Sequence, residues 1–145
     1  MTNSESETEH SDIIPHSAFR IPHSECGIDL VEIDRIAEMV ARFGDRFVQR
    51  VWTEQEIAIC RGRFPELAAR FAGKEAAMKT LGTGVVGIGW REVEITREPS
   101  GKPVLVLHGK ALARAQKLGF HSWSVSLTHT RAMACAVVVA LRIDD

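Results

Sequence analysis

The segment from Arg70 to Gly84, RFAGKEAAMKTLGTG, constrains the fold most, because it predicts a helix and also the place where that helix ends. Its three alanines favour a helix. The sequence Gly82-Thr83-Gly84 follows where the helical pattern stops, and glycine after the last turn is a common helix end. We therefore expect one long helix that begins near Pro65 and stops at Gly82.

Charged residues gather on this predicted helix. At 3.6 residues per turn, Arg70 lies one turn before Lys74, and Glu75 lies one turn before Lys79. One carboxylate is thus placed among three cations. Taken alone, this arrangement predicts a solvated face with a Glu75–Lys79 ion pair worth about 0.3 kcal/mol. In combination with the segment at residues 27–35, the arrangement favours a binding site instead.

A second unusual segment is GIDLVEIDR, residues 27–35, in which Asp29 interrupts a run of β-prone apolar residues. A buried strand would normally carry a hydrophobic residue at that position, because an unpaired buried carboxylate is costly. Two interpretations remain open for Asp29: it lies at a strand edge facing water, or it is paired with a cation.

The rest of the chain alternates short helical and extended patterns, which predicts an α+β fold with helices packed on one face of an antiparallel sheet. Helices are expected at residues 33–44, at 53–62 after a capping box that starts at Thr53, and at 109–118. Strands are expected at 90–96, at 104–107 after a turn at 100–103, at 123–127, and at 132–141 as a central strand. The first of these is expected to be half-buried, with Val93 and Ile95 inward and Glu92 and Glu94 outward.

Composition limits the class of protein. A length of 145 residues supports one domain, and a net charge of −1 gives no indication of nucleic-acid binding. No apolar run reaches the roughly 18 residues of a membrane span. Three widely spaced cysteines favour reduced thiols in a cytoplasmic protein. Residues 1–24 are polar and predict a disordered tail before a domain at 25–143.

Four blocks, in order, carry a family resemblance: GIDLVEIDR with Asp29, FAGKEAAMK followed by GTG, GKP at 101–103, and VSLTHT at 125–130. Together they resemble holo-acyl-carrier-protein synthase, the small class of the 4′-phosphopantetheinyl transferase superfamily, over residues 26–142. The resemblance implies transfer of 4′-phosphopantetheine from coenzyme A to a serine of an apo acyl carrier protein, with Mg²⁺ as cofactor and adenosine 3′,5′-bisphosphate as the second product. It also implies a homotrimer with active sites shared between neighbouring chains.

The resemblance assigns roles to individual residues. It implies that Asp29 and Glu75 hold Mg²⁺, that Glu75 takes the serine proton directly or through a metal-bound water, and that Lys79 neutralises a phosphate. The implied contacts to coenzyme A are Arg70, Lys74, Lys79, Gly82, Thr83, Gly84, Lys102, Pro103 and His129, the last from the neighbouring chain. Arg35 and Arg42 are implied to bind the acidic carrier.

Two other classes of function remain open. One is a non-catalytic module of the same fold that binds coenzyme A or a nucleotide, and the other is a purely structural trimer. The presence of both Asp29 and Glu75 favours the enzyme over the binding module. The cationic helix favours both the enzyme and the binding module over a purely structural protein.

Overall fold

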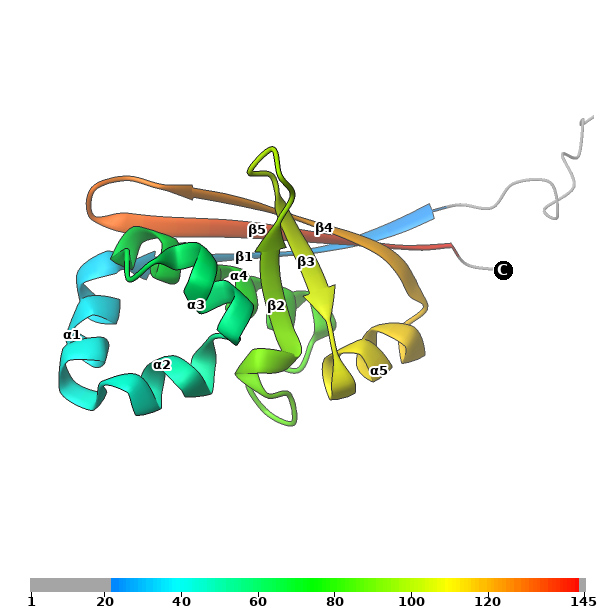
Figure 1. Cartoon of the computed structure of the whole chain (residues 1–145). Coiled ribbons are helices and arrows are strands. Elements are labelled where there is room, and N and C mark those ends of the chain that lie inside the picture. The colour runs from blue at the N-terminus through cyan, green and yellow to red at the C-terminus, as the bar shows by residue number, and fades with distance from the viewer. Residues whose placement is uncertain (1–21, 144–145) are drawn as a thin grey trace, which may run out of the picture.

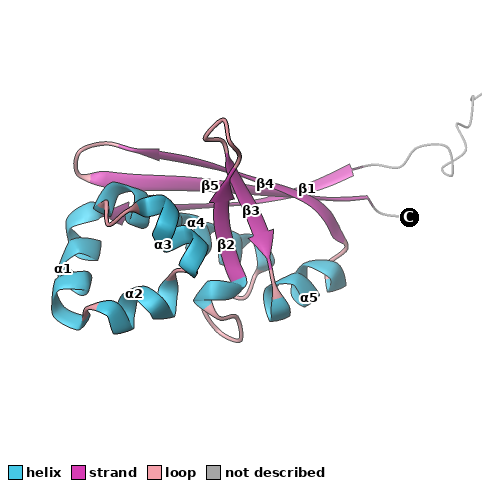
Figure 2. Cartoon of the chain, in the orientation of Figure 1, coloured by secondary structure: helices cyan, strands magenta, loops and turns pink. Residues whose placement is uncertain are grey.

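Three long antiparallel strands in the order β1–β5–β4 form a layer with helices on one of its faces, and a two-stranded hairpin, β2–β3, crosses beside it (Figure 1). This computed structural model describes residues 22–143. The helices are α1 (Ile33–Phe43), α2 (Asp45–Val51), α3 (Glu54–Cys60), α4 (Phe64–Leu81) and α5 (Gly109–Lys117). The strands are β1 (Pro22–Glu32), β2 (Val93–Arg97), β3 (Pro103–Leu107), β4 (Phe120–His129) and β5 (Met133–Ile143). Figure 2 shows the same division into helices and strands.

The predicted α+β class is confirmed, and the apolar run near the C-terminus is the central strand, as expected. On β5 the residues that face α4 are small, which lets the long helix lie close to the sheet: Ala134, Ala136, Val138 and Ala140. The opposite face of the sheet carries none of the described helices. Within residues 22–143, no helix is long and apolar enough to cross a membrane.

Gly27 allows α4 to touch β1 directly. A Cβ atom at this position would overlap the carbonyl oxygen of Ala76 and would lie 2.6 Å from Oγ1 of Thr80, so any larger residue would push the helix away. Because Asp29 is two residues further along the same face of the strand, this contact brings its carboxylate against α4.

The predicted helix ends are largely confirmed. Helix α4 ends at Gly82, which has φ 72° and donates its N–H to the carbonyl of Lys79. Helix α3 begins with the predicted capping box between Thr53 and Glu56. Helix α1 ends at Gly44, where φ is 63°.

Three expectations need correction. Helix α2 has no counterpart among the predicted helices. Strand β2 begins only at Val93, after a single 3₁₀ turn, and Glu94 is buried instead of facing water, because helix α3 and His108 cover its side. Strand β1 begins at Pro22, so residues 22–24 belong to the sheet and not to the predicted tail; the remaining 21 residues of that prediction lie outside the described part.

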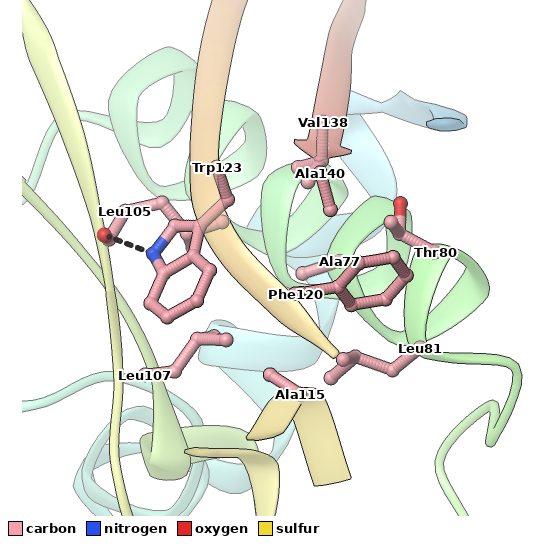
Figure 3. Close-up of a pocket in the computed structure, with 10 residues that line it drawn as sticks. All are labelled: Ala77, Thr80, Leu81, Leu105, Leu107, Ala115, Phe120, Trp123, Val138 and Ala140. Carbon is pink, nitrogen blue, oxygen red and sulfur yellow. Dashed lines mark hydrogen bonds between the residues drawn. The ribbon is translucent and has the colours of Figure 1, made fainter. Parts of the chain in front are cut away.

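The core between α4, α5 and the strands contains a narrow apolar gap, shown in Figure 3. Phe120, Leu81 and Val138 line it, and the Trp123 indole N–H donates to the carbonyl of Leu105 at 3.0 Å. Its free volume of about 10 Å³ is at the lower limit for one water molecule. We conclude that it is a packing gap and not a substrate site.

Candidate active site

The candidate site forms where β1 meets the second half of α4. Along β1, Gly27, Asp29 and Val31 face the helix, while Ile28 and Leu30 face the opposite side, with exposed fractions of 59% and 60%. The Asp29 side chain is only 12% exposed. Asp29 therefore lies on an edge strand but points inward, against α4.

Lys79 reaches this strand from α4. Its ammonium group donates to Asp29 Oδ1 at 3.0 Å and to the Ile28 carbonyl at 2.9 Å. The interpretation of Asp29 as a cation-paired residue is thus confirmed, whereas the ion pair expected within the helix, between Glu75 and Lys79, is replaced by this contact. The Lys79 side chain remains 57% exposed, so it can also meet an anion from solvent.

Glu75 lies beside Asp29. Burial, a hydrogen bond with Asp29 and the negative charge of Asp29 raise the pKa of Glu75 to about 7, while Lys79 and Arg35 act in the opposite direction. The carboxyl groups of Glu75 and Asp29 therefore lie close enough to share a hydrogen bond. The structure therefore brings together Asp29, Glu75 and Lys79, three residues that the sequence analysis assigned to catalysis.

The two carboxyl groups fit a divalent cation. Apart from the carboxyl group of Glu75, the buried Asp29 Oδ2 has no hydrogen-bond donor within the described part of the chain. A hard cation such as Mg²⁺ would satisfy this oxygen and would replace the proton that Glu75 otherwise retains. No group of three His, Cys, Asp or Glu side chains that could hold a metal occurs in residues 22–143. The remaining ligands would therefore come from substrate oxygens and water, as is common for Mg²⁺.

This arrangement predicts a pH-dependent stability without metal. The folded chain keeps the Glu75 proton up to a pKa of about 7, whereas the ordinary value is 4.5. The folded state thus binds more protons between these values, so the free energy of unfolding should fall as pH rises through this window. In the presence of a chelator, the melting temperature of wild type relative to Glu75→Gln should decrease from pH 5 to pH 7.5. Parallel curves for the two proteins would contradict the proximity of the carboxyl groups.

A second cluster of predicted residues lies beside the opposite edge of the sheet. Arg70, Pro103 and His129 line a groove of about 160 Å³, together with Gly101 and Glu66. The Arg70 guanidinium donates to the carbonyl of Ile95 and to Glu66, both at 3.0 Å, and is mostly buried. Lys102 is exposed in the turn between β2 and β3.

The two clusters are separated by the width of the sheet. Asp29 pairs with Ala136 on β5, and Ala136 pairs on its other side with Leu127 of β4. His129 follows two residues later at the end of β4. One chain thus carries Asp29 on one edge strand and His129 on the other.

The turn after α4 has the conformation expected of its glycines. Gly82 and Gly84 have φ of 72° and 56°, and the Thr83 hydroxyl donates to the carbonyl of Gly84 at 3.0 Å. The turn begins three residues after Lys79, at the same end of the helix. Gly82 and Gly84 are exposed at that end of the helix, and a contact of this turn with coenzyme A stays a prediction.

Lys74 is the predicted site residue that the structure places elsewhere. Its side chain is completely buried, and its ammonium group donates to Glu56 Oε1 at 2.6 Å and to the carbonyls of Val93 and Trp90. Burial lowers the pKa of Lys74, and the negative charge of Glu56 opposes this effect. In this conformation Lys74 cannot contact a phosphate, because its donors are used inside the protein.

Arg35, one of the two predicted carrier-binding arginines, borders an apolar groove that the sequence did not indicate. Arg35 and Arg50 flank a groove of about 290 Å³ whose walls include Met39, Phe47, and Phe71 from α4. An adjoining groove contains Met39, Phe43, Arg46, Phe47 and Arg50. Arg42 lies over the ring of Phe43 at 5.2 Å. Finding this surface required knowledge of α2, which brings Phe47 and Arg50 beside α1.

Comparisons with known proteins find one family along most of the chain. Residues 25–138 match the family described as the 4′-phosphopantetheinyl transferase superfamily. The chain is 52% identical over 122 residues to the holo-[acyl-carrier-protein] synthase of Herpetosiphon aurantiacus, covering 79% of this chain and 96% of that protein. It is 48% identical over 117 residues to the enzyme of the same name from Koribacter versatilis, covering 78% and 94%.

Solved structures show the same similarity. The Helicobacter pylori holo-[acyl-carrier-protein] synthase in complex with coenzyme A superposes with a TM-score of 0.72 at 30% identity. The match covers 82% of this chain and 99% of that one. The Neisseria meningitidis synthase also gives a TM-score of 0.72, at 33% identity, with coverage of 80% and 96%.

Proposed function

Because the chain belongs to the 4′-phosphopantetheinyl transferase superfamily, we propose that the Asp29–Glu75 pair is the centre at which it transfers 4′-phosphopantetheine from coenzyme A to an acyl carrier protein. The activity itself is that of a holo-[acyl-carrier-protein] synthase. The observation that carries the assignment of the site is the contact between two carboxyl groups from β1 and α4, next to the cation of Lys79.

The reaction is a phosphoryl transfer. The serine oxygen of the carrier attacks the phosphorus that bears the pantetheine arm, and the bond from that phosphorus to the bridging oxygen breaks. Adenosine 3′,5′-bisphosphate leaves with the bridging oxygen and its electron pair, and the serine proton must pass to a base. Such transfers depend mainly on positioning and on cations around the phosphates.

The residues of this chain supply those needs. Glu75, held beside Asp29, would accept the serine proton directly or through a metal-bound water. Asp29 and Glu75 would hold Mg²⁺, which when bound neutralises charge on the pyrophosphate. The exposed ammonium of Lys79 would pair with a phosphate oxygen. At the other cluster, Arg70, Pro103 and His129 form a groove for the nucleotide end of coenzyme A.

The direct test is to incubate the protein with apo-carrier, coenzyme A and Mg²⁺ and to weigh the carrier by mass spectrometry. We expect a mass gain of one phosphopantetheine group, and no gain when a chelator is present. Coenzyme A binding without any mass gain would instead indicate a non-catalytic binding module. No binding and no gain would leave only a structural role.

Self-association as a trimer is part of the proposal. The face of the sheet away from the helices exposes large apolar side chains: Ile28, Leu30, Val137, Leu141 and Ile143. Exposed apolar surface of this kind is typical of a protein interface. Cyclic association would also bring the β1 edge of one chain beside the β4 edge of the next. Asp29 and His129, on opposite edges within a chain, would then meet across the interface.

We also propose that the enzyme is located in the cytoplasm. Cys26, Cys60 and Cys135 are all free thiols in the structure, which suits the reducing cytoplasm.

Arg35 is proposed to bind the acidic carrier. It is exposed on α1, beside the apolar groove and close enough to Glu75 to affect its pKa. Replacing Arg35 with glutamate reverses its charge, so KM for the carrier should rise about tenfold or more while KM for coenzyme A changes little. Initial rates with each substrate varied in turn measure the two constants. The matched control is Lys117→Glu, which reverses an exposed cation on α5, away from α1 (Figure 1). An unchanged carrier KM in the Arg35 variant would refute the assignment.

A further inference from the structure

The outer edge of β2 has side chains where a neighbouring strand would be. Among residues 22–143, strand β2 pairs with β3 along one edge only. On its other edge, Lys74 donates to the carbonyl of Val93 and Arg70 donates to the carbonyl of Ile95 at 3.0 Å. Glu56 Oε2 accepts the N–H of Ile95 at 3.1 Å. Three charged side chains from α3 and α4 therefore satisfy the backbone groups that a further strand would pair with.

The charged side chains at this edge also restrict how α4 can be oriented. Lys74 and Glu56 are both completely buried, and their charged groups lie 2.6 Å apart. Removing two charges from water is costly, but apolar residues of the same volume would leave the Val93 carbonyl and the Ile95 N–H without these partners. The hydrogen bonds of the charged side chains are directional and therefore favour one orientation of α4 against the edge of β2.

The orientation that these bonds fix is the one that the active site needs. Lys74 and Glu75 are consecutive on α4, so their side chains point about 100° apart around the helix axis. While Lys74 is held towards β2, Glu75 is directed towards Asp29 on β1. A rotation of α4 would break the hydrogen bonds of Lys74 and, at the same time, separate the carboxyl groups of Glu75 and Asp29.

We propose that Lys74, through its buried pair with Glu56, is a positioning residue that sets the rotation of α4 and so holds Glu75 against Asp29, and that it does not contact the phosphates of coenzyme A. This inference rests on the proposed function, because it assigns Lys74 a role in orienting the residue that carries out the transfer. It replaces the phosphate contact that the sequence resemblance implied.

The test compares Lys74→Met and Glu56→Gln with the double variant of both. Exposed residues of the same types supply the matched controls, Lys117→Met on α5 and Glu54→Gln on α3. All proteins are first melted, and kinetics are measured well below the lowest melting temperature. Isothermal titration with adenosine 3′,5′-bisphosphate gives the affinity for the nucleotide end separately from turnover.

If Lys74 acts by positioning, kcat should fall by roughly 10- to 100-fold in Lys74→Met, whereas affinity for adenosine 3′,5′-bisphosphate stays within about twofold. Glu56→Gln should also lower kcat. This effect could not come from a lost substrate contact, because a buried carboxylate does not bind an anionic substrate. The double variant should be no worse than Lys74→Met, because both changes break one unit. The two controls should match wild type.

Other results would overturn the inference. A tenfold loss of nucleotide affinity in Lys74→Met, with kcat preserved, would show a direct phosphate contact. Wild-type kcat in Glu56→Gln would show that the pair does not affect Glu75, and this variant decides the question if Lys74→Met does not fold. A wild-type enzyme that fails to modify any carrier would instead count against the proposed function, so the two failures are distinguishable.

Discussion

Replacing Glu75 with glutamine is expected to abolish transfer while leaving most of the affinity for coenzyme A. Glutamine has almost the same shape, but it cannot accept the serine proton and is a weaker ligand for a divalent cation. Proton transfer by a positioned side chain contributes about 10²- to 10⁴-fold to rate, so a loss of at least this size is expected in kcat. The other proposed contacts to the pyrophosphate and the adenosine do not involve Glu75, which predicts a coenzyme A affinity within about threefold of wild type.

Initial rates of carrier modification and calorimetric titration with coenzyme A measure these two quantities. Asp29→Asn is the informative companion, because it removes the other carboxylate without removing the proposed base. Its activity should recover partly at high Mg²⁺, whereas that of Glu75→Gln should not. Equal losses of turnover and coenzyme A affinity in Glu75→Gln would argue that Glu75 has only a structural role.

Much of the Glu75 environment could be predicted because its determinants are local. The end of α4 at Gly82 and the spacing of Glu75 and Lys79 depend on residues that are neighbours in sequence. The inward direction of Asp29 is different in kind. It depends on Gly27, whose missing side chain lets the strand touch α4, and this close approach is visible only in three dimensions.

Lys74 shows where prediction from sequence reached its limit. Its family position suggested a phosphate contact, but its partners are Glu56, 18 residues away, and backbone carbonyls at the edge of β2. No local pattern indicates that a strand edge will meet a helix there. Glu94 was misassigned for the same reason, because Thr53 and His108 arrive from distant segments to hydrogen-bond its carboxylate.

The second large effect concerns assembly: two inactive variants should restore activity when they are mixed. If Asp29 of one chain and His129 of the next build one site, then Asp29→Asn and His129→Ala each damage every site of their own homotrimer. In trimers assembled from an equal mixture, about one site in four receives the intact residue from both sides, which predicts recovery of about a quarter of wild-type activity.

The mixture must be allowed to exchange subunits, for example by dilution from mild denaturant, before carrier modification is measured. The matched control is Asp29→Asn mixed with Glu75→Gln. Both of those residues lie on the same side of the proposed interface, in contact within one chain, so no hybrid site can be intact and no activity should return. Recovery in the control as well would indicate that Asp29 and Glu75 serve different sites. No recovery in the Asp29–His129 mixture, in spite of proven exchange, would mean that each chain holds a complete site by itself. Coenzyme A bound in the groove at Arg70 and His129 would then have to extend around the sheet of the same chain to Glu75.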